Sequence, residues 1–171
     1  MKNMAEFFQK FITNLEKFFA PFPHFPTNFL KTLLPIIPWY LFLRGLIEII
    51  GGLKSLSTSF QLDALPKVFA EFIEFKPAFL FWNGITMLII GFLYFTAFTQ
   101  LAHKKTQLLG WQNWLLATIL STISRLYLVI FNHDSIFLTL VVTFIGWFFI
   151  FEFKKLYTPP KTKKNTSKPK D

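Results

Sequence analysis

Four long runs of mainly apolar residues dominate the chain. They cover about residues 33–53, 78–98, 114–131 and 135–153, within a region that extends over residues 29–157. An α-helix rises about 1.5 Å per residue, so about 20 apolar residues cross a hydrocarbon core about 30 Å thick. The pattern therefore predicts an all-α membrane protein whose membrane domain is a bundle of four transmembrane helices. Trp111 and Trp114 stand at the start of the third run, where indole rings are expected in the headgroup layer.

A shorter segment with a different pattern precedes the first run. Within residues 1–20 one helical face is polar and the other is apolar, and the apolar face comprises Met4, Phe8, Phe11, Leu15 and Phe18. This spacing is typical of an amphipathic helix whose polar residues prevent it from spanning. We expect it to lie in the cytoplasmic headgroup layer, with docking onto a partner as the alternative. A stiff linker of Pro and Phe residues follows over 21–28.

The connections outside the predicted spans are polar. Residues 55–59 are expected to form a flexible stretch, and the next apolar side chains, Leu62, Leu65, Phe69 and Phe72, fall near one helical face. This spacing predicts a second, short interfacial helix in the first external loop. Residues 158–171 offer no apolar side chain to bury, so we expect a disordered basic cytoplasmic tail.

Composition supports the membrane class and removes several chemistries. Of 171 residues, 53% are hydrophobic and 16% are charged, against about 25% charged in a typical soluble protein. The chain has no cysteine, which excludes disulfides, thiolate catalysis and cysteine–metal sites. His24, His103 and His133 lie in three separate connections, so no metal site is expected. No glycine-rich phosphate loop is present, and we expect no cofactor.

The lysines are distributed unequally between the two sides of the predicted bundle. Lys54, Lys67 and Lys76 belong to the first loop, whereas the other lysines belong to the termini and the second loop. The positive-inside rule then places both termini in the cytoplasm of a protein that spans the cell membrane several times. The basic tail is expected to contact anionic lipid headgroups, at about 1 kcal/mol per lysine near the surface. We expect no nucleic-acid partner, because the tail lacks arginines and aromatic residues.

Four polar residues in or near the spans form a candidate intramembrane cluster: Arg44, Glu48, Asn83 and Arg125. A charge at the centre of a spanning helix costs about 2.5–3.5 kcal/mol on insertion scales, so such groups usually pair inside the protein. Arg44 and Glu48 share a helical face at a spacing of four residues. The cluster is either a structural ion pair or a site for a substrate, a proton or a lipid headgroup.

A second candidate site is the external hairpin between the last two runs. His133 and Asp134 lie there and are most simply part of a turn followed by a helix cap. Together with Glu48 they are the only plausible acid–base groups for a membrane enzyme acting on a lipid or a quinone-like substrate. No catalytic residue is assigned, and we do not expect an enzyme.

Small residues recur on one face of each run and should mark the interior of the bundle, because they let helices approach closely in lipid. In chain order they are Gly45 and Gly52, then Gly84 and Gly91, then Ala117, Ser121, Ser124 and the adjacent Arg125, then Thr139, Thr143, Gly146 and the adjacent Ile150.

The eight residues from Glu48 to Ser55, Glu-Ile-Ile-Gly-Gly-Leu-Lys-Ser, resemble the first-helix motif of the small multidrug resistance transporters. Those proteins are four-helix, proton-coupled exporters whose membrane glutamate binds either drug or protons. The resemblance implies that role for Glu48. Lys54 stands about two positions early for the motif, and the second-helix pattern of that family is absent from residues 78–98.

These observations favour a non-catalytic accessory, scaffold or lipid-interacting membrane subunit, acting with a membrane-protein partner or as a homo-oligomer. The alternative is a small proton-coupled transporter that uses Glu48 with Arg44 or Arg125.

Overall fold

The computed structural model describes residues 2–64, 77–132 and 136–157. This part of the chain forms six helices and no strand: α1 Lys2–Phe19, α2 Thr27–Leu33, α3 Ile36–Asp63, α5 Pro77–Leu101, α6 Gln107–Asn132 and α7 Ile136–Tyr157. The interfacial helix predicted in the first loop and the basic tail fall mainly or wholly outside these residues.

Three of the helices, α3, α5 and α7, are long and apolar enough to cross a membrane, which indicates a membrane protein. The predicted third span, 114–131, lies within α6, a helix of 26 residues between α5 and α7. A fourth membrane span remains a prediction.

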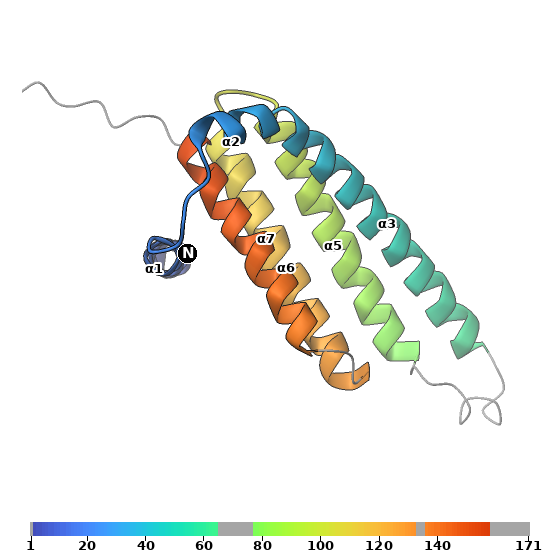
Figure 1. Cartoon of the computed structure of the whole chain (residues 1–171). Helices are drawn as coiled ribbons and strands as arrows, with labels where there is room; N and C mark the ends of the chain where they lie inside the picture. Colours follow the sequence, from blue (N-terminus) through green and yellow to red (C-terminus); the bar gives the residue numbers. More distant parts are fainter. Residues whose placement is uncertain (1, 65–76, 133–135, 158–171) are drawn as a thin grey trace, which may run out of the picture.

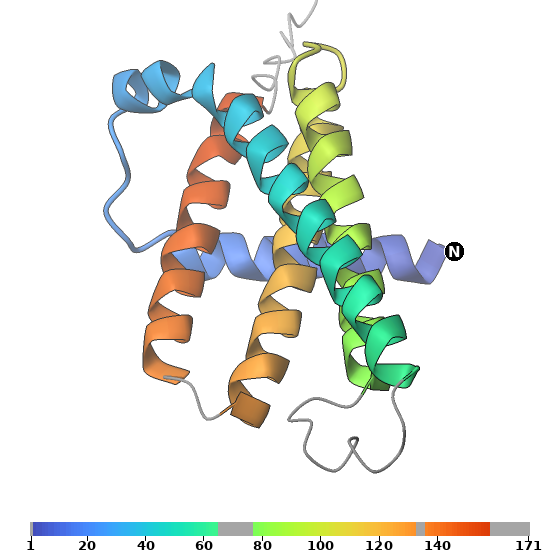
Figure 2. The ribbon, with the colours of Figure 1, turned by 90° about the vertical axis from the view of Figure 1, so that its right-hand side faces the viewer.

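The four long helices run side by side in the order α3, α5, α6, α7, and each packs antiparallel on the next (Figures 1 and 2). The α1 helix runs across them rather than along them, and it contacts α7 (Figure 2). The short α2 helix lies at the end of the bundle where α3 begins and α7 ends (Figure 1). Helices α3 and α7 therefore form the two edges of the row.

The closest packing in the bundle joins α3 to α5 through paired glycines. A Cβ atom added at Gly52 would lie 2.9 Å from the carbonyl oxygen of Gly84, and one added at Gly45 would lie 3.1 Å from that of Gly91. The prediction that small residues mark the interior of the bundle is therefore confirmed for the glycines of the first two runs. The two glycines of each helix are one heptad apart, as expected for two antiparallel helices that stay in contact along one face.

Helix α3 continues to Asp63, nearly three turns beyond the predicted end of the first span at residue 53. The expectation of a flexible stretch over residues 55–59 is wrong, because two serines in it bond to the start of α5. The hydroxyl of Ser55 donates to the carbonyl of Leu80 at 2.8 Å, and that of Ser59 donates to the carbonyl of Pro77 at 2.7 Å.

The α6–α7 contact buries the two tryptophans that were expected in the headgroup layer. Trp111 is fully buried, and its indole N–H donates to the carbonyl of Ile150 at 2.7 Å. The ammonium of Lys154 lies 5.1 Å from the centroid of the same ring. Trp114 is also buried, with its ring 6.1 Å from that of Phe153. An indole whose N–H finds a carbonyl inside the bundle no longer needs water.

Candidate functional site

A cavity of about 380 Å³ lies between the long helices, with lining residues from α3, α5, α6 and α7. Its volume falls in the lower part of the range of about 300–1,000 Å³ typical of small-molecule sites. Its apolar lining includes Ile37, Trp114 and Val142. Its polar lining consists of Tyr40, Arg44, Tyr94, Thr118, Ser121, Thr122, Arg125 and Thr143.

Arg44 in the cavity wall forms an ion pair with Glu48, one turn further along α3. Glu48 is only 6% exposed and does not line the cavity. It lies on the same face of α3 as Gly45 and Gly52, which is the face in contact with α5. The pair brings a negative and a positive charge together at the edge of the cavity, so the two largely cancel. This geometry favours the structural alternative for Arg44 and Glu48.

Hydroxyl groups connect the three other helices at the cavity wall. The phenol of Tyr94 on α5 interacts with the side chains of Thr118 and Arg44. On α6, the hydroxyl of Thr122 donates to the carbonyl of Thr118 at 2.8 Å and accepts the indole N–H of Trp147, on α7, at 3.1 Å. A hydrogen bond thus joins α6 to α7 at the cavity wall, and the phenol of Tyr94 lies within interaction distance of side chains from α3 and α6.

Arg125 lines the same cavity from α6 and is exposed. Its guanidinium has no carboxylate partner among the residues that the structure describes. No acidic side chain lines the cavity. Since Arg44 is neutralised by Glu48, the cavity carries about one net positive charge.

The remaining residues of the two predicted sites lie elsewhere. Asn83 borders a different pocket, between α5 and α6, and its side-chain amide contacts the sulfur of Met87 at 3.6 Å. The structure therefore brings Arg44 and Arg125 to one cavity, with Glu48 behind its wall as the partner of Arg44, and it separates Asn83 from them. His133 and Asp134 lie outside the described residues. Within those residues, no group of three histidine or acidic side chains gathers as at a metal site.

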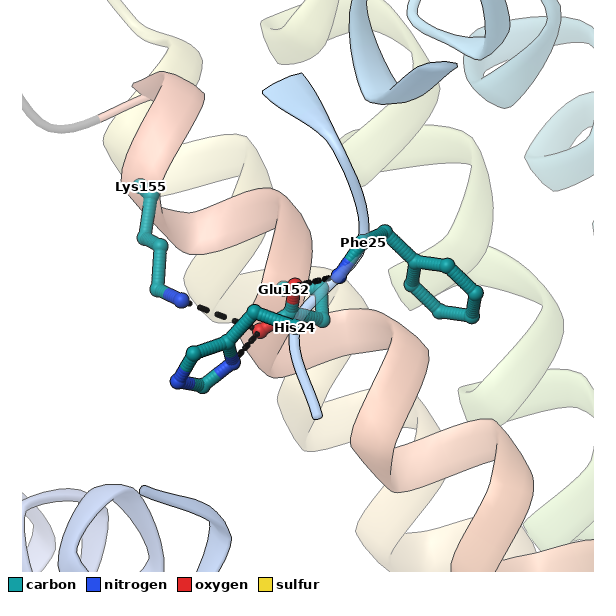
Figure 3. Close-up of polar contacts among 4 residues, drawn as sticks. All are labelled: His24, Phe25, Glu152 and Lys155. Atoms are coloured by element: carbon teal, nitrogen blue, oxygen red, sulfur yellow. Dashed lines mark hydrogen bonds and ion pairs between the residues drawn. The ribbon is translucent and has the colours of Figure 1, made fainter. Parts of the chain in front are cut away.

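Sequence reasoning missed a second polar centre, around Glu152 on α7 (Figure 3). This carboxylate is 3% exposed and lies beside the linker that joins α1 to α2. One of its oxygens is 2.7 Å from Nδ1 of His24 and 3.1 Å from Nζ of Lys155, and the other accepts the backbone N–H of Phe25 at 3.0 Å. The sequence did contain a signal for this centre, because Glu152 is an acidic residue within the predicted fourth span, 135–153.

Helix α7 also holds α1, through residues that extend from its middle, at Phe144, to Lys154. Lys154 forms an ion pair with Glu16, and the ring of Phe19 stacks on Phe151 with centroids 5.4 Å apart. Phe11 meets the edge of Trp147 at 6.2 Å. The N-terminal helix is therefore fixed to the bundle by one ion pair and a cluster of aromatic rings, which includes Phe18, Phe22, Phe144 and Phe148.

Comparisons with protein-family models, with curated proteins and with solved structures found no match.

Proposed function

We propose that this chain is a four-span protein of the cell membrane, with both termini in the cytoplasm, that acts as a non-catalytic, lipid-interacting accessory or scaffold subunit. The observation that carries the proposal is the position of α1 across the long helices (Figure 2). If α3, α5 and α7 cross the bilayer, a helix that runs across them, as α1 does about halfway along the bundle in Figure 2, is oriented roughly parallel to the membrane plane. That is the orientation of an interfacial helix.

The free surface of α1 fits the headgroup layer. Ile12 and Phe19 are buried against the bundle, whereas Phe7 is 71% exposed. Lys10 and Lys17 are also exposed on this helix. Exposed phenylalanine beside lysine is what a helix offers to acyl chains and anionic headgroups at once.

The distribution of lysines supports a cytoplasmic location for the end of the bundle at which α2 lies. Helix α2, the loop between α5 and α6, and the last turn of α7 lie at the same end of the bundle (Figures 1 and 2). These three elements contain Lys31, Lys104, Lys105, Lys154 and Lys155. Lysines collected at one end favour the cytoplasmic side for that end.

Spin labels on single cysteines test both α1 and the topology, because the natural chain has no cysteine. In reconstituted vesicles, a label at Phe7→Cys should be shielded from an aqueous relaxation agent, whereas Lys104→Cys, in the α5–α6 loop, should be accessible. In intact cells, a cysteine at Asp171→Cys should resist a membrane-impermeant reagent until the cells are lysed. Equal accessibility of Phe7→Cys and Lys104→Cys, or labelling of Asp171→Cys in intact cells, would refute the proposal.

A small proton-coupled transporter is the second candidate, supported by a cavity whose wall holds Arg44, the partner of the buried Glu48. This function requires Glu48 to exchange protons. The test compares proton-coupled uptake of candidate cationic drugs into proteoliposomes that contain the natural chain or Glu48→Gln. Flux that is unchanged in the variant would eliminate the transporter.

A further inference from the structure

The cavity between α3, α5, α6 and α7 combines positive charge with free hydroxyl groups. We propose that it binds the phosphate group of an anionic membrane amphiphile, with Arg125 as the main ionic contact. This inference rests on the proposed lipid-interacting function and specifies the ligand class of one site.

The charge of the cavity calls for an anion. Glu48 already neutralises Arg44, so Arg125 supplies the charge that is left over. A charged side chain within a membrane span costs about 2.5–3.5 kcal/mol on insertion scales unless it is paired or hydrated. A bound anion supplies that pairing. The planar guanidinium can also donate two parallel hydrogen bonds to a phosphate.

The hydrogen-bond donors distinguish a phosphate from a smaller anion. The hydroxyls of Tyr40, Ser121 and Thr143 line the cavity and make no hydrogen bond to any described residue. Ser121 is only 8% exposed, so little water reaches it from outside. Three free hydroxyls and a guanidinium offer more donors than the two oxygens of a carboxylate readily accept, whereas a phosphate has further oxygens.

The position of the cavity suits a ligand that arrives from the bilayer. Its lining includes Ile37 on α3 and Val142 on α7, the helices at the two edges of the row, which diverge from the top toward the bottom of the view in Figure 2. Val142 in the lining is 48% exposed and is a suitable neighbour for an acyl chain. A headgroup at Arg125 with its chain between α3 and α7 therefore meets matching surfaces at both ends.

Gly146 provides a way to close the cavity without disturbing its charges. It lines the cavity, and a Cβ added there would have no atom within 4 Å. A leucine at this position should therefore fit the backbone and project into the ligand space.

The experiment measures binding of short-chain phosphatidic acid to the full chain in a mild uncharged detergent, by calorimetry. Phosphatidylcholine of equal chain length and inorganic phosphate are titrated separately. We expect saturable binding of phosphatidic acid, weakened about tenfold or more in both Arg125→Gln and Gly146→Leu. The control Lys105→Gln removes an exposed loop lysine and should change the affinity less than about twofold. Thermal unfolding of each variant without ligand reports whether it is folded.

Each outcome has a defined meaning. Inorganic phosphate that binds with the same dependence on Arg125 would support a phosphate site and assign it to a soluble anion. Equal binding of phosphatidic acid by the natural chain and by folded Gly146→Leu would overturn the inference, since any lipid bound would then lie outside the cavity. Such a result would leave the proposed function intact if Phe7→Cys is still shielded in vesicles.

Discussion

Adjacent glycines on α3 provide the sharpest test of the packing between α3 and α5. A Cβ at Gly52 would lie 2.9 Å from the backbone carbonyl oxygen of Gly84, whereas a Cβ at Gly51 would meet only the end of the Met87 side chain, with Cε at 2.5 Å. A flexible methionine can move aside, but the backbone of a packed helix cannot. Gly52→Ala should therefore force the two helices apart, and Gly51→Ala should not.

The magnitude follows from two opposing effects. Replacing glycine by alanine within a helix stabilises it by about 1 kcal/mol in both variants. Overpacking costs about 1–3 kcal/mol where the neighbours cannot yield, which applies only to Gly52. We expect Gly51→Ala to be neutral or stabilised by up to about 1 kcal/mol, and Gly52→Ala to be less stable than Gly51→Ala by about 1–3 kcal/mol.

The difference is measurable by unfolding both variants with a denaturing detergent in mixed micelles, followed by circular dichroism. Because the helix-propensity term is the same at both positions, the comparison isolates the steric term. Equal stability of the two alanine variants would refute the glycine-paired contact between α3 and α5.

Three further substitutions test the polar contacts, with the same unfolding assay unless stated. Glu48→Ala should cost about 1–3 kcal/mol, since it leaves the half-buried Arg44 in the cavity wall without its partner, and a stability like that of the natural chain would contradict the ion pair. Trp111→Phe should cost about 1 kcal/mol through loss of its hydrogen bond to the carbonyl of Ile150, and an unchanged midpoint would mean that this bond is not formed. Glu152→Ala should release the linker at His24, detected as faster limited proteolysis within residues 20–26 of the detergent-solubilised protein, whereas an unaltered cleavage rate would argue against the contact.

The sequence indicated the α3–α5 interface well, because two independent patterns agree on it. Gly45 and Gly52 recur one heptad apart in one apolar run, and Gly84 and Gly91 do so in the next. Small residues at this period leave one compact arrangement for an antiparallel pair. Gly146 also belongs to a predicted stripe of small residues, but it borders a cavity. Two helices approach closely only where both of them present small residues at the contact.

Features that depend on a distant partner could not be predicted in the same way. From sequence alone, a serine-containing segment is predicted to be a loop, because the hydrogen-bond partners of its hydroxyls are not known. In the structure, Ser55 and Ser59 donate to carbonyls at the start of α5. Trp111 fits a headgroup position by residue type alone, and only the carbonyl of Ile150 makes burial of its N–H favourable. Arg44 and Glu48 were recognisable because their partnership is local, at one helical turn.

The position of α1 is the clearest example of a feature that sequence periodicity leaves open. Its apolar face suits a bilayer surface, a partner protein or the bundle itself, and hydrophobicity alone does not distinguish these surfaces. The contacts of Glu152 distinguish them, because a carboxylate buried in an apolar helix needs hydrogen-bond donors or a counter-charge. Lys155, on the same helix, supplies a local counter-charge, and His24 and Phe25 supply the donors that hold the linker against α7. A helix held there remains next to Trp147, which also lines the cavity, so the N-terminal helix and the cavity share a wall.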